Sequence, residues 1–400
     1  MAQFLTRRAA LALAAAPLWP GRARAAEAAL EPDAAALERI RALRPNQSLR
    51  LGRAKVVGDF NATARQFGLD RTGPRARDYC RKMVWAPERR RALFAGANHG
   101  VPHRLNDVWE FDLVAMAWVL LYAPDLPRSY GGLGPDASDV VFRDGVLMTR
   151  RGGPAVVGHT WSGLTYDAAS RSMLFMNVWP IRVEPLVEQL GGDVAQRYQG
   201  PPLWRFDPAS RRWTFVRTPA PAPFPAVGAL LEWVPELAGT VWHMNDWQLS
   251  ATWLLDGERP AWKVIADAAS SPGFAEHAPG RELVGYHDPV RRLLVAQHEH
   301  ATFHFDTASR RWTGTIRSGG PHGYDAHTVF YRHPATGLGL LVDFRDGRIH
   351  AYDPDKRSWR TLLPQGDAMP WGPRVLSYVD QALDVLVSVD DTNVWIYRPG

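Results

Sequence analysis

A motif made of an aromatic or apolar residue, an aspartate, five residues and a tryptophan recurs five times in this 400-residue chain. Two copies, FDPASRRW at 206–213 and FDTASRRW at 305–312, are almost identical. The Asp and Trp of the five copies are Asp112 and Trp118, Asp207 and Trp213, Asp256 and Trp262, Asp306 and Trp312, and Asp353 and Trp359. Such an internal repeat predicts one supersecondary unit that is copied and stacked on its neighbours.

The repeated unit is predicted to be a meander of four short strands. Segments such as TFHFD at 302–306 and RIHAY at 348–352 alternate as half-buried strands do. DTASRR and DPDKRS are turn sequences, in which the Asp can accept hydrogen bonds from amides ahead of it. The Trp then begins a fourth strand and is expected to pack between neighbouring sheets. A ring of such meanders is a β-propeller, which is an all-β fold.

The pattern resembles the kelch-like propellers, including the central domain of galactose-oxidase-type proteins, over roughly residues 79–400. The double glycine of that family is missing, and Gly96 is at best a remnant of it. A single propeller of six four-stranded blades is expected, with a strand near 48–60 closing the ring. The six blades are predicted at 79–123, 159–218, 225–267, 281–318, 323–365 and 369–400. A seventh blade around 139–152 is the alternative.

The first 25 residues indicate a twin-arginine signal peptide, with an Arg7-Arg8 pair, an Ala/Leu stretch and a cleavage site at Ala23-Arg24-Ala25. The apolar run is shorter than the roughly 20 residues that a membrane span needs. A helical leader at 26–47, with a helix over 33–43 capped by Asp33, would precede the propeller at 48–400. These features predict a periplasmic or secreted protein.

The net charge bears on which partners the protein can have. Cleavage of the signal would remove four arginines and no acid, so the formal net charge would fall from +6 to +2. Such a balanced chain gives little support to a nucleic-acid partner.

Cys80 is the only cysteine, so no internal disulfide can form. A monomer is expected.

The meander also determines which loops share a face. The loops between second and third strands and the crossovers between blades lie on one face, which we call the crossover face. The turns between first and second strands and those between third and fourth strands lie on the opposite face, which we call the turn face. The long segments 124–158 and 180–201 both belong to the crossover face, where function is expected to concentrate. The candidate substrate-binding residues predicted at that face are Asn98, His99, Asn245, Trp179, Trp247 and Trp371.

Four further residues of the crossover face suit β-elimination on a uronate-containing glycan. Arg374 would bind the substrate carboxylate, His159 or His327 would remove the proton, and Tyr324 would protonate the leaving oxygen. The tryptophans would stack on sugar rings. The leading hypothesis is therefore a polysaccharide lyase, whose partner is an acidic polysaccharide or oligosaccharide.

Three alternatives remain open. One is a non-catalytic periplasmic propeller that binds a glycan or a protein. Another is a copper radical oxidase, since the galactose-oxidase resemblance implies a cross-linking cysteine near Cys80. That alternative is disfavoured, because His159 replaces the expected tyrosine and Tyr324 and His327 are not adjacent. The third is a divalent metal ion bound by His298 and His300, which would alternate on one strand. No other cofactor is implied.

Overall fold

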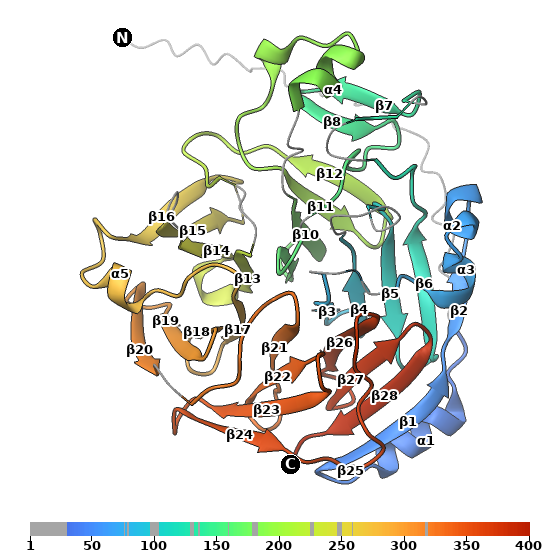
Figure 1. Cartoon of the computed structure of the whole chain (residues 1–400), viewed down its shortest axis with the longest axis vertical. Helices are drawn as coiled ribbons and strands as arrows, with labels where there is room; N and C mark the ends of the chain where they lie inside the picture. The colour runs from blue at the N-terminus through green and yellow to red at the C-terminus, as the bar shows by residue number, and fades with distance from the viewer. Residues whose placement is uncertain are drawn as a thin grey trace, which may run out of the picture. The chain divides into compact units, whose positions relative to one another are not determined.

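Six sheets surround a central axis, as Figure 1 shows. The structure, a computed structural model, describes residues 30–75, 77, 80–96, 104–128, 132–134, 137–158, 160–177, 183–224, 228–245, 250–257, 259–316 and 319–400. All six sheets belong to one unit, residues 32–400. The first strands of successive blades are neighbours around the whole ring, from β3 through β9, β13, β17, β21 and β26 back to β3. The all-β, six-bladed propeller expected from the repeat is confirmed.

Each of the first three blades is a meander of four antiparallel strands. Their strands are β3 (Val84–Ala86), β4 (Arg91–Phe94), β5 (Val108–Asp112) and β6 (Ala117–Tyr122); β9 (Leu164–Asp167), β10 (Ser172–Met176), β11 (Leu203–Asp207) and β12 (Arg212–Val216); and β13 (Leu230–Val234), β14 (Gly239–Asn245), β15 (Ser250–Asp256) and β16 (Trp262–Asp267).

Blades 4 and 5 repeat this meander, whereas blade 6 takes its fourth strand from the start of the chain. Their strands are β17 (Val284–Asp288), β18 (Leu293–His298), β19 (Ala301–Asp306) and β20 (Arg311–Ile316); β21 (Thr328–Arg332), β22 (Gly339–Asp343), β23 (Arg348–Asp353) and β24 (Ser358–Leu362); and β26 (Val375–Asp380), β27 (Val385–Asp390), β28 (Asn393–Arg398) and β1 (Gln47–Arg53).

The N-terminal strand closes the ring, as the sequence predicts. Strand β1 pairs antiparallel with β28, from Gln47 opposite Arg398 to Arg53 opposite Asn393. The short strand β25 (Gln365–Gly366) covers its outer edge. The chain then continues into β2 (Lys55–Gly58), which pairs parallel with β6 of blade 1. Residues 47–58 therefore join the last blade to the first.

The alternative of a seventh blade is wrong. Residues 139–152 do form two strands, β7 (Val140–Arg143) and β8 (Val146–Thr149), but these make a separate two-stranded sheet. This hairpin packs on α4 (Val183–Gln189) through a buried apolar cluster that includes Leu147, Leu186 and Val187. The two long segments of the crossover face therefore bury their apolar side chains against each other, beside blade 2 at the top of Figure 1.

Short helices lie outside the blades. Helix α1 (Ala34–Ala42) begins after Asp33, whose Oδ1 accepts a hydrogen bond from the Ala36 amide, as its sequence predicts. Its Ile40 is buried in the cluster that also contains Leu51 of β1. The others are α2 (Ala62–Gln66), α3 (Leu69–Thr72), α5 (Phe274–His277), η1 (Val194–Gln196) and η2 (Pro235–Leu237). In the described part of the chain, no helix has the length and apolarity to cross a membrane.

The repeated tryptophans connect each blade to the blade before it. Trp213 donates its indole hydrogen to the Asn106 carbonyl of blade 1, at 3.3 Å. Trp312 donates to Thr252 Oγ1 of blade 3, at 2.9 Å, and both rings are buried. The repeated aspartates fix the turn before each Trp. Asp207, for instance, accepts hydrogen bonds from the Ala209 amide and from the Ser210 hydroxyl group. The motif recurs because five of the six blades use this turn and pack its Trp at the interface with the preceding blade.

Candidate functional site

A turn in the crossover that enters blade 5 brings two predicted site residues together. The Tyr324 carbonyl accepts hydrogen bonds from the amides of His327 and Thr328, at 2.9 and 2.8 Å. The Thr328 side chain also accepts from the Tyr324 amide. This one-turn structure places the rings of Tyr324 and His327 with their centroids 5.2 Å apart, both half-buried at the crossover face.

Two more histidines extend this pair. The His322 ring lies 6.2 Å from that of Tyr324 and 5.2 Å from that of His300. His300 belongs to the loop between β18 and β19, and the bridge between Glu299 and Gly323 fastens that loop to the crossover. We call His300, His322, Tyr324 and His327 the ring cluster.

Arginines border the ring cluster. Arg345, just after β22, donates to both carboxylate oxygens of Asp343, and its Nη2 lies 2.5 Å from Oδ2. Burial raises the pKa of Asp343, but the hydrogen bonds and charge of Arg345 outweigh burial and lower that pKa overall. Arg81 donates to the Ala326 carbonyl at 2.9 Å and to the Gly372 carbonyl at 3.0 Å. The cluster therefore lies beside two guanidinium groups.

This environment keeps His322 and His327 neutral. Burial lowers the pKa of His327, and the charges of Arg81 and Arg345 lower it further. Burial, with Arg345 and His300, also lowers the pKa of His322. An imidazole whose pKa is lowered is in its proton-accepting form at neutral pH. The ring cluster therefore offers a neutral base next to a tyrosine hydroxyl group.

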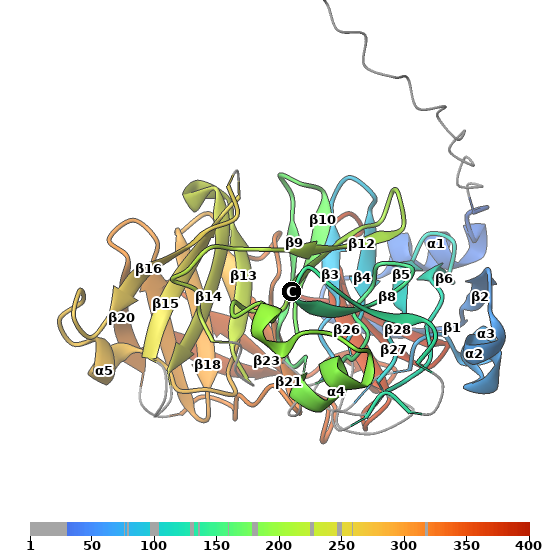
Figure 2. The ribbon, with the colours of Figure 1, turned by 90° about the horizontal axis from the view of Figure 1, so that it is seen from above.

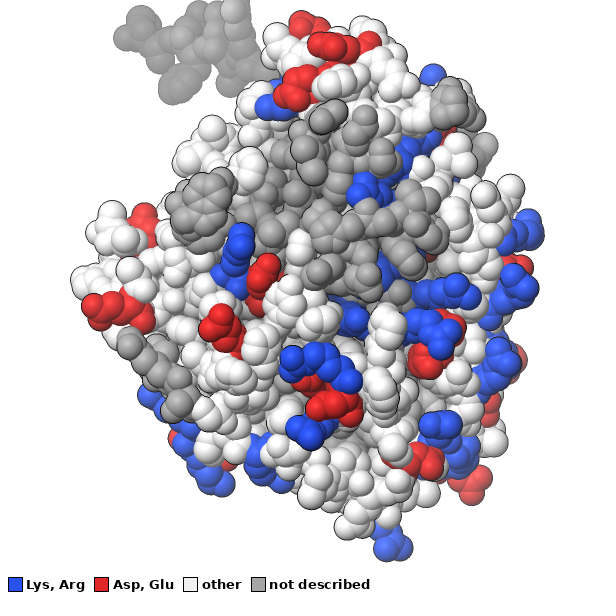
Figure 3. All heavy atoms as spheres, in the orientation of Figure 1, with Lys and Arg blue, Asp and Glu red and all other residues white. Residues whose placement is uncertain are grey.

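An exposed tryptophan lies on the same face. Trp371 is 64% exposed, which is unusual for so large an apolar side chain. Its loop lies against the turn after β22. The Gly372 amide donates to the Phe344 carbonyl, and a Cβ at Gly347 would lie 3.4 Å from the Trp371 ring. Figure 3 looks onto this face, where basic and acidic side chains lie next to one another over blades 5 and 6.

Two other predicted site residues have local partners. The exposed Arg374 forms ion pairs with Asp390 at 3.7 Å and Asp391 at 3.5 Å, at the end of β27. Asn245, the last residue of β14, accepts from the Ser250 hydroxyl at 2.6 Å and donates weakly to the Ala278 carbonyl. The remaining predicted site residues, Asn98, His99, His159, Trp179 and Trp247, lie outside the described residues.

The expectation that His298 and His300 alternate along one strand is wrong. Strand β18 ends at His298 and β19 begins at Ala301. Glu299 between them has φ of 49°, which turns the chain. Both histidines nevertheless line one surface cavity of about 400 Å³. Within the residues that the structure describes, no group of three or more His, Cys, Asp or Glu side chains is placed to hold a metal ion.

Cys80 has the environment of a packing residue. It is buried, and its Sγ donates to the Ala95 carbonyl at 3.2 Å. A Cβ at Gly96 would come within 2.4 Å of this sulfur. Burial raises the pKa of the Cys80 thiol to about 12, so the thiol stays protonated and unreactive. This environment does not suit the cross-linking cysteine of a copper radical oxidase.

Sequence reasoning did not select His322, Arg345 or Asp325 for the site. The available signals were the position of His322 two residues before Tyr324, and the DFRDG turn that contains Arg345. Asp325 is 3% exposed, and neither carboxylate oxygen makes a hydrogen bond of normal geometry. Burial, together with the nearby Glu282, raises the pKa of Asp325 well above the ordinary range. No sequence pattern shows that this carboxyl group is buried.

No family model matches the chain, and no curated protein matches it. Among solved structures, a chain of the nidogen/laminin complex is 7% identical with a TM-score of 0.43, and the match covers 74% of this chain and 84% of that chain. A chain of the mitotic checkpoint complex is 12% identical with a TM-score of 0.44, and the match covers 99% of this chain and 98% of that chain. Likenesses this weak say nothing about activity.

Proposed function

We propose that this protein is an exported, carbohydrate-active propeller that cleaves uronate-containing glycans by β-elimination at the ring cluster. The observation that supports this most is the Tyr324–His327 pair, whose rings lie 5.2 Å apart at a half-buried site on the crossover face. A neutral imidazole, a phenol and a neighbouring guanidinium group are the three functional groups that this reaction needs.

The proposed reaction assigns one role to each group. His327 takes the proton from the carbon next to the uronate carboxylate. Arg345 pairs with that carboxylate and stabilises the charge that develops on it. Tyr324 gives its proton to the leaving glycosidic oxygen, so a carbon–oxygen bond breaks as a carbon–carbon double bond forms. Arg345 is assigned this role in place of Arg374 because Arg345 lies beside the ring cluster. The Nη1 atom of Arg345 makes none of the hydrogen bonds to Asp343.

Substrate binding would rest on Trp371. Its exposed ring suits stacking against the apolar face of a sugar, which is a contact that aromatic side chains make well. His159 stays a second candidate for the base. Export through residues 1–25 is part of the proposal and rests on the sequence of that segment alone.

The test incubates the protein with polygalacturonate and with alginate oligomers, and follows the ultraviolet absorbance of the unsaturated product. Tyr324→Phe and His327→Gln should each lower kcat by roughly 10²–10⁴-fold, the usual contribution of a general acid or base. His287→Gln, near the turn-face end of β17, is the matched control and should keep full activity. Unchanged turnover in both cluster variants would refute the assignment.

A non-catalytic, glycan-binding propeller is the second candidate. It is favoured by the ion pairs of Arg345 with Asp343 and of Arg374 with its two aspartates, because a guanidinium group that is already neutralised stabilises less developing charge. Saturable binding of the oligomers that depends on Trp371, without any unsaturated product, would establish this alternative.

A further inference from the structure

A second cavity lies on the propeller axis, away from the ring cluster. It has a volume of about 310 Å³, and residues from the first strands of all six blades line it. Its lining also includes Pro235, Pro289, Pro334 and Gln381, which follow the first strands of blades 3 to 6. The cavity therefore extends to the turn face, which lies at the upper edge of Figure 2, whereas the crossover face lies at the lower edge near α4.

A buried ion pair provides the main polar contact inside this cavity. Lys82 Nζ lies 2.5 Å from Glu232 Oε1 and also donates to the Leu231 carbonyl at 3.3 Å. The Lys82 residue is only 8% exposed. An ammonium group has three N–H donors and a carboxylate has two oxygens. Among the described residues, one Lys82 N–H and one Glu232 oxygen therefore have no hydrogen-bond partner, and they present a donor and an acceptor side by side.

Several other polar groups of the lining are already satisfied, although the Tyr286 hydroxyl has no hydrogen-bond partner among the described residues. Tyr331 donates its hydroxyl to the Ser377 carbonyl at 2.5 Å. Tyr166 donates to Glu88, and Thr165 Oγ1 accepts from the Trp233 amide at 3.0 Å. The Lys82–Glu232 pair is the part of the lining in which a donor and an acceptor with remaining hydrogen-bonding capacity lie side by side.

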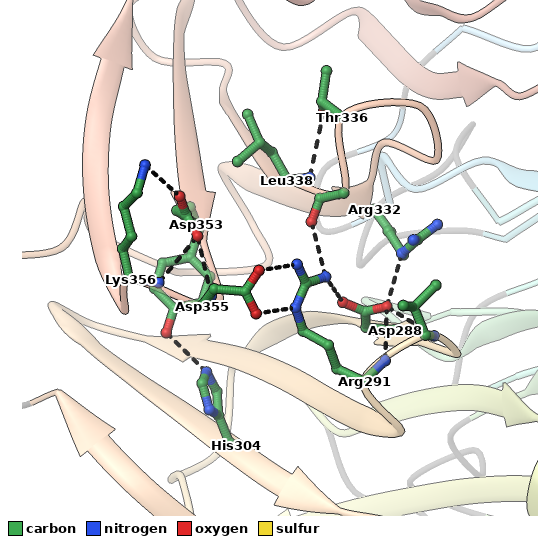
Figure 4. Close-up of polar contacts among 12 residues, drawn as sticks. Asp288, Arg291, His304, Arg332, Thr336, Leu338, Asp353, Asp355 and Lys356 are labelled. Carbon is green, nitrogen blue, oxygen red and sulfur yellow. Dashed lines mark hydrogen bonds and ion pairs between the residues drawn. The ribbon is translucent and has the colours of Figure 1, made fainter.

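The charged side chains Lys82, Glu232 and Arg332 of the lining each have an ion-pair partner. Arg332 Nε lies 2.9 Å from Asp288, which also binds Arg291, and Arg291 in turn pairs with Asp355, as Figure 4 shows. These two arginines and two aspartates cancel. His287 bonds Glu236 at 2.9 Å, and Lys82 is matched by Glu232. Because the cations and the carboxylate of the lining are already paired with opposite charges, they attract an ion weakly, and the cavity favours an uncharged ligand.

Aromatic side chains form a large part of the lining. Seven of the lining residues are Trp, Tyr or Phe, and among them Trp85 stacks on Tyr378 with the rings 13° from parallel. Aromatic faces bind the apolar C–H faces of saturated rings, and a donor next to an acceptor matches two adjacent hydroxyl groups. We propose that this cavity binds an uncharged sugar ring through one vicinal diol, at a site separate from the ring cluster.

Isothermal titration calorimetry with methyl β-D-glucopyranoside tests this proposal on the full chain. Saturable binding to one site is expected. The per-O-methylated glucoside, which has the same ring but no hydroxyl donor, should bind at least about tenfold more weakly, as expected for the loss of one hydrogen bond to a charged group. The negatively charged methyl β-D-glucuronide should also bind more weakly than the neutral glucoside.

Two variants locate the binding. Glu232→Gln should weaken glucoside binding about tenfold and improve glucuronide binding, because Lys82 then lacks its counter-charge. Trp371→Ala, on the other face, should leave glucoside binding unchanged. Melting temperatures show whether both variants fold. If Glu232→Gln does not fold, Trp233→Ala takes its place in the same test. Absence of saturable glucoside binding would overturn the proposal, and so would binding that is lost in Trp371→Ala but kept in Glu232→Gln.

Discussion

Single residues in the crossover before β21 decide what the ring cluster can do. Tyr324 and His327 point to the crossover face from one turn, and the residue next to Tyr324, Asp325, is buried without a hydrogen-bond partner of normal geometry. An ionised carboxylate in such a place is costly, because the weak contacts with the backbone amides of Asp325 and Ala326 do not make up for the water that it loses. The turn therefore keeps Asp325 at the expense of stability.

Replacing Asp325 tests this cost. Because burial raises its pKa, the folded protein keeps the proton to higher pH than the unfolded chain does, so stability falls as pH rises above the ordinary pKa of Asp. Asp325→Asn, which cannot ionise, should melt several degrees higher than the natural protein at pH 8 and at nearly the same temperature at pH 4. The measurement is thermal unfolding across this pH range. A lower melting temperature for Asp325→Asn at pH 8 would show that the carboxylate has a stabilising partner.

At the scale of the element, the repeated turn and tryptophan form one unit. In four of the third-to-fourth strand turns, the residue two positions before the Trp has a positive φ: Met116, Arg211, Arg310 and Arg357. The Asp side chain stabilises this tight turn, and the turn delivers the Trp to the interface with the preceding blade. Trp359, for example, donates to Thr302 Oγ1 of blade 4 at 2.8 Å.

Removing one of these tryptophans should therefore weaken the contact between two blades. Trp312 is 4% exposed and hydrogen-bonded to Thr252 across the interface. Trp312→Ala should lower the free energy of unfolding by about 3–5 kcal/mol, the usual cost of emptying a large aromatic site. Trp371→Ala, at an exposed ring, should change it by only about 0.5 kcal/mol. Urea unfolding of both variants measures this difference, and equal effects would contradict the role of Trp312 between blades.

At the scale of the molecule, the ring depends on pairing the two ends of the propeller. Strand β1 covers the edge of β28, which would otherwise expose unpaired backbone groups. Ring closure thus relies on a contact between residues that are very far apart in sequence, and the entropy of closing so long a loop opposes it.

A disulfide across this closure should stabilise the whole ring. Arg53 and Asn393 are opposite each other, and both are exposed. Antiparallel partners lie roughly 4.5–5.5 Å apart, within the range that a disulfide spans. The oxidised Arg53→Cys, Asn393→Cys protein should gain about 4–5 kcal/mol and lose it on reduction. Melting with and without reductant tests this, with Arg53→Cys alone as the control. Melting that does not change on reduction would mean that the closure is not the weak point.

The repeat pattern determined most of the fold. Strand alternation, turn residues and the Asp–Trp spacing act over a few neighbouring residues, so the six meanders, the capped helix α1 and the separation into two faces could all be derived from local rules. The two strands at 140–149 were also predictable, but not their place. A hairpin becomes a blade only if further strands pair with it, and here its apolar side is covered by α4 instead.

The sequence by itself determined that polar and aromatic side chains gather at the crossover face, because strand direction decides where each loop emerges. Only the tertiary structure decided which of them meet: Arg345 lies beside His327, whereas Arg374 pairs with Asp390 and Asp391. The same holds for the burial of Asp325 and for the Lys82–Glu232 pair inside the axial cavity. The Lys82–Glu232 pair joins blade 1 to blade 3, whereas Arg345 and His327, like Arg374 and its aspartates, lie near the ends of two strands of one blade. These arrangements follow from packing, which brings distant residues together, and no local pattern in a sequence records it.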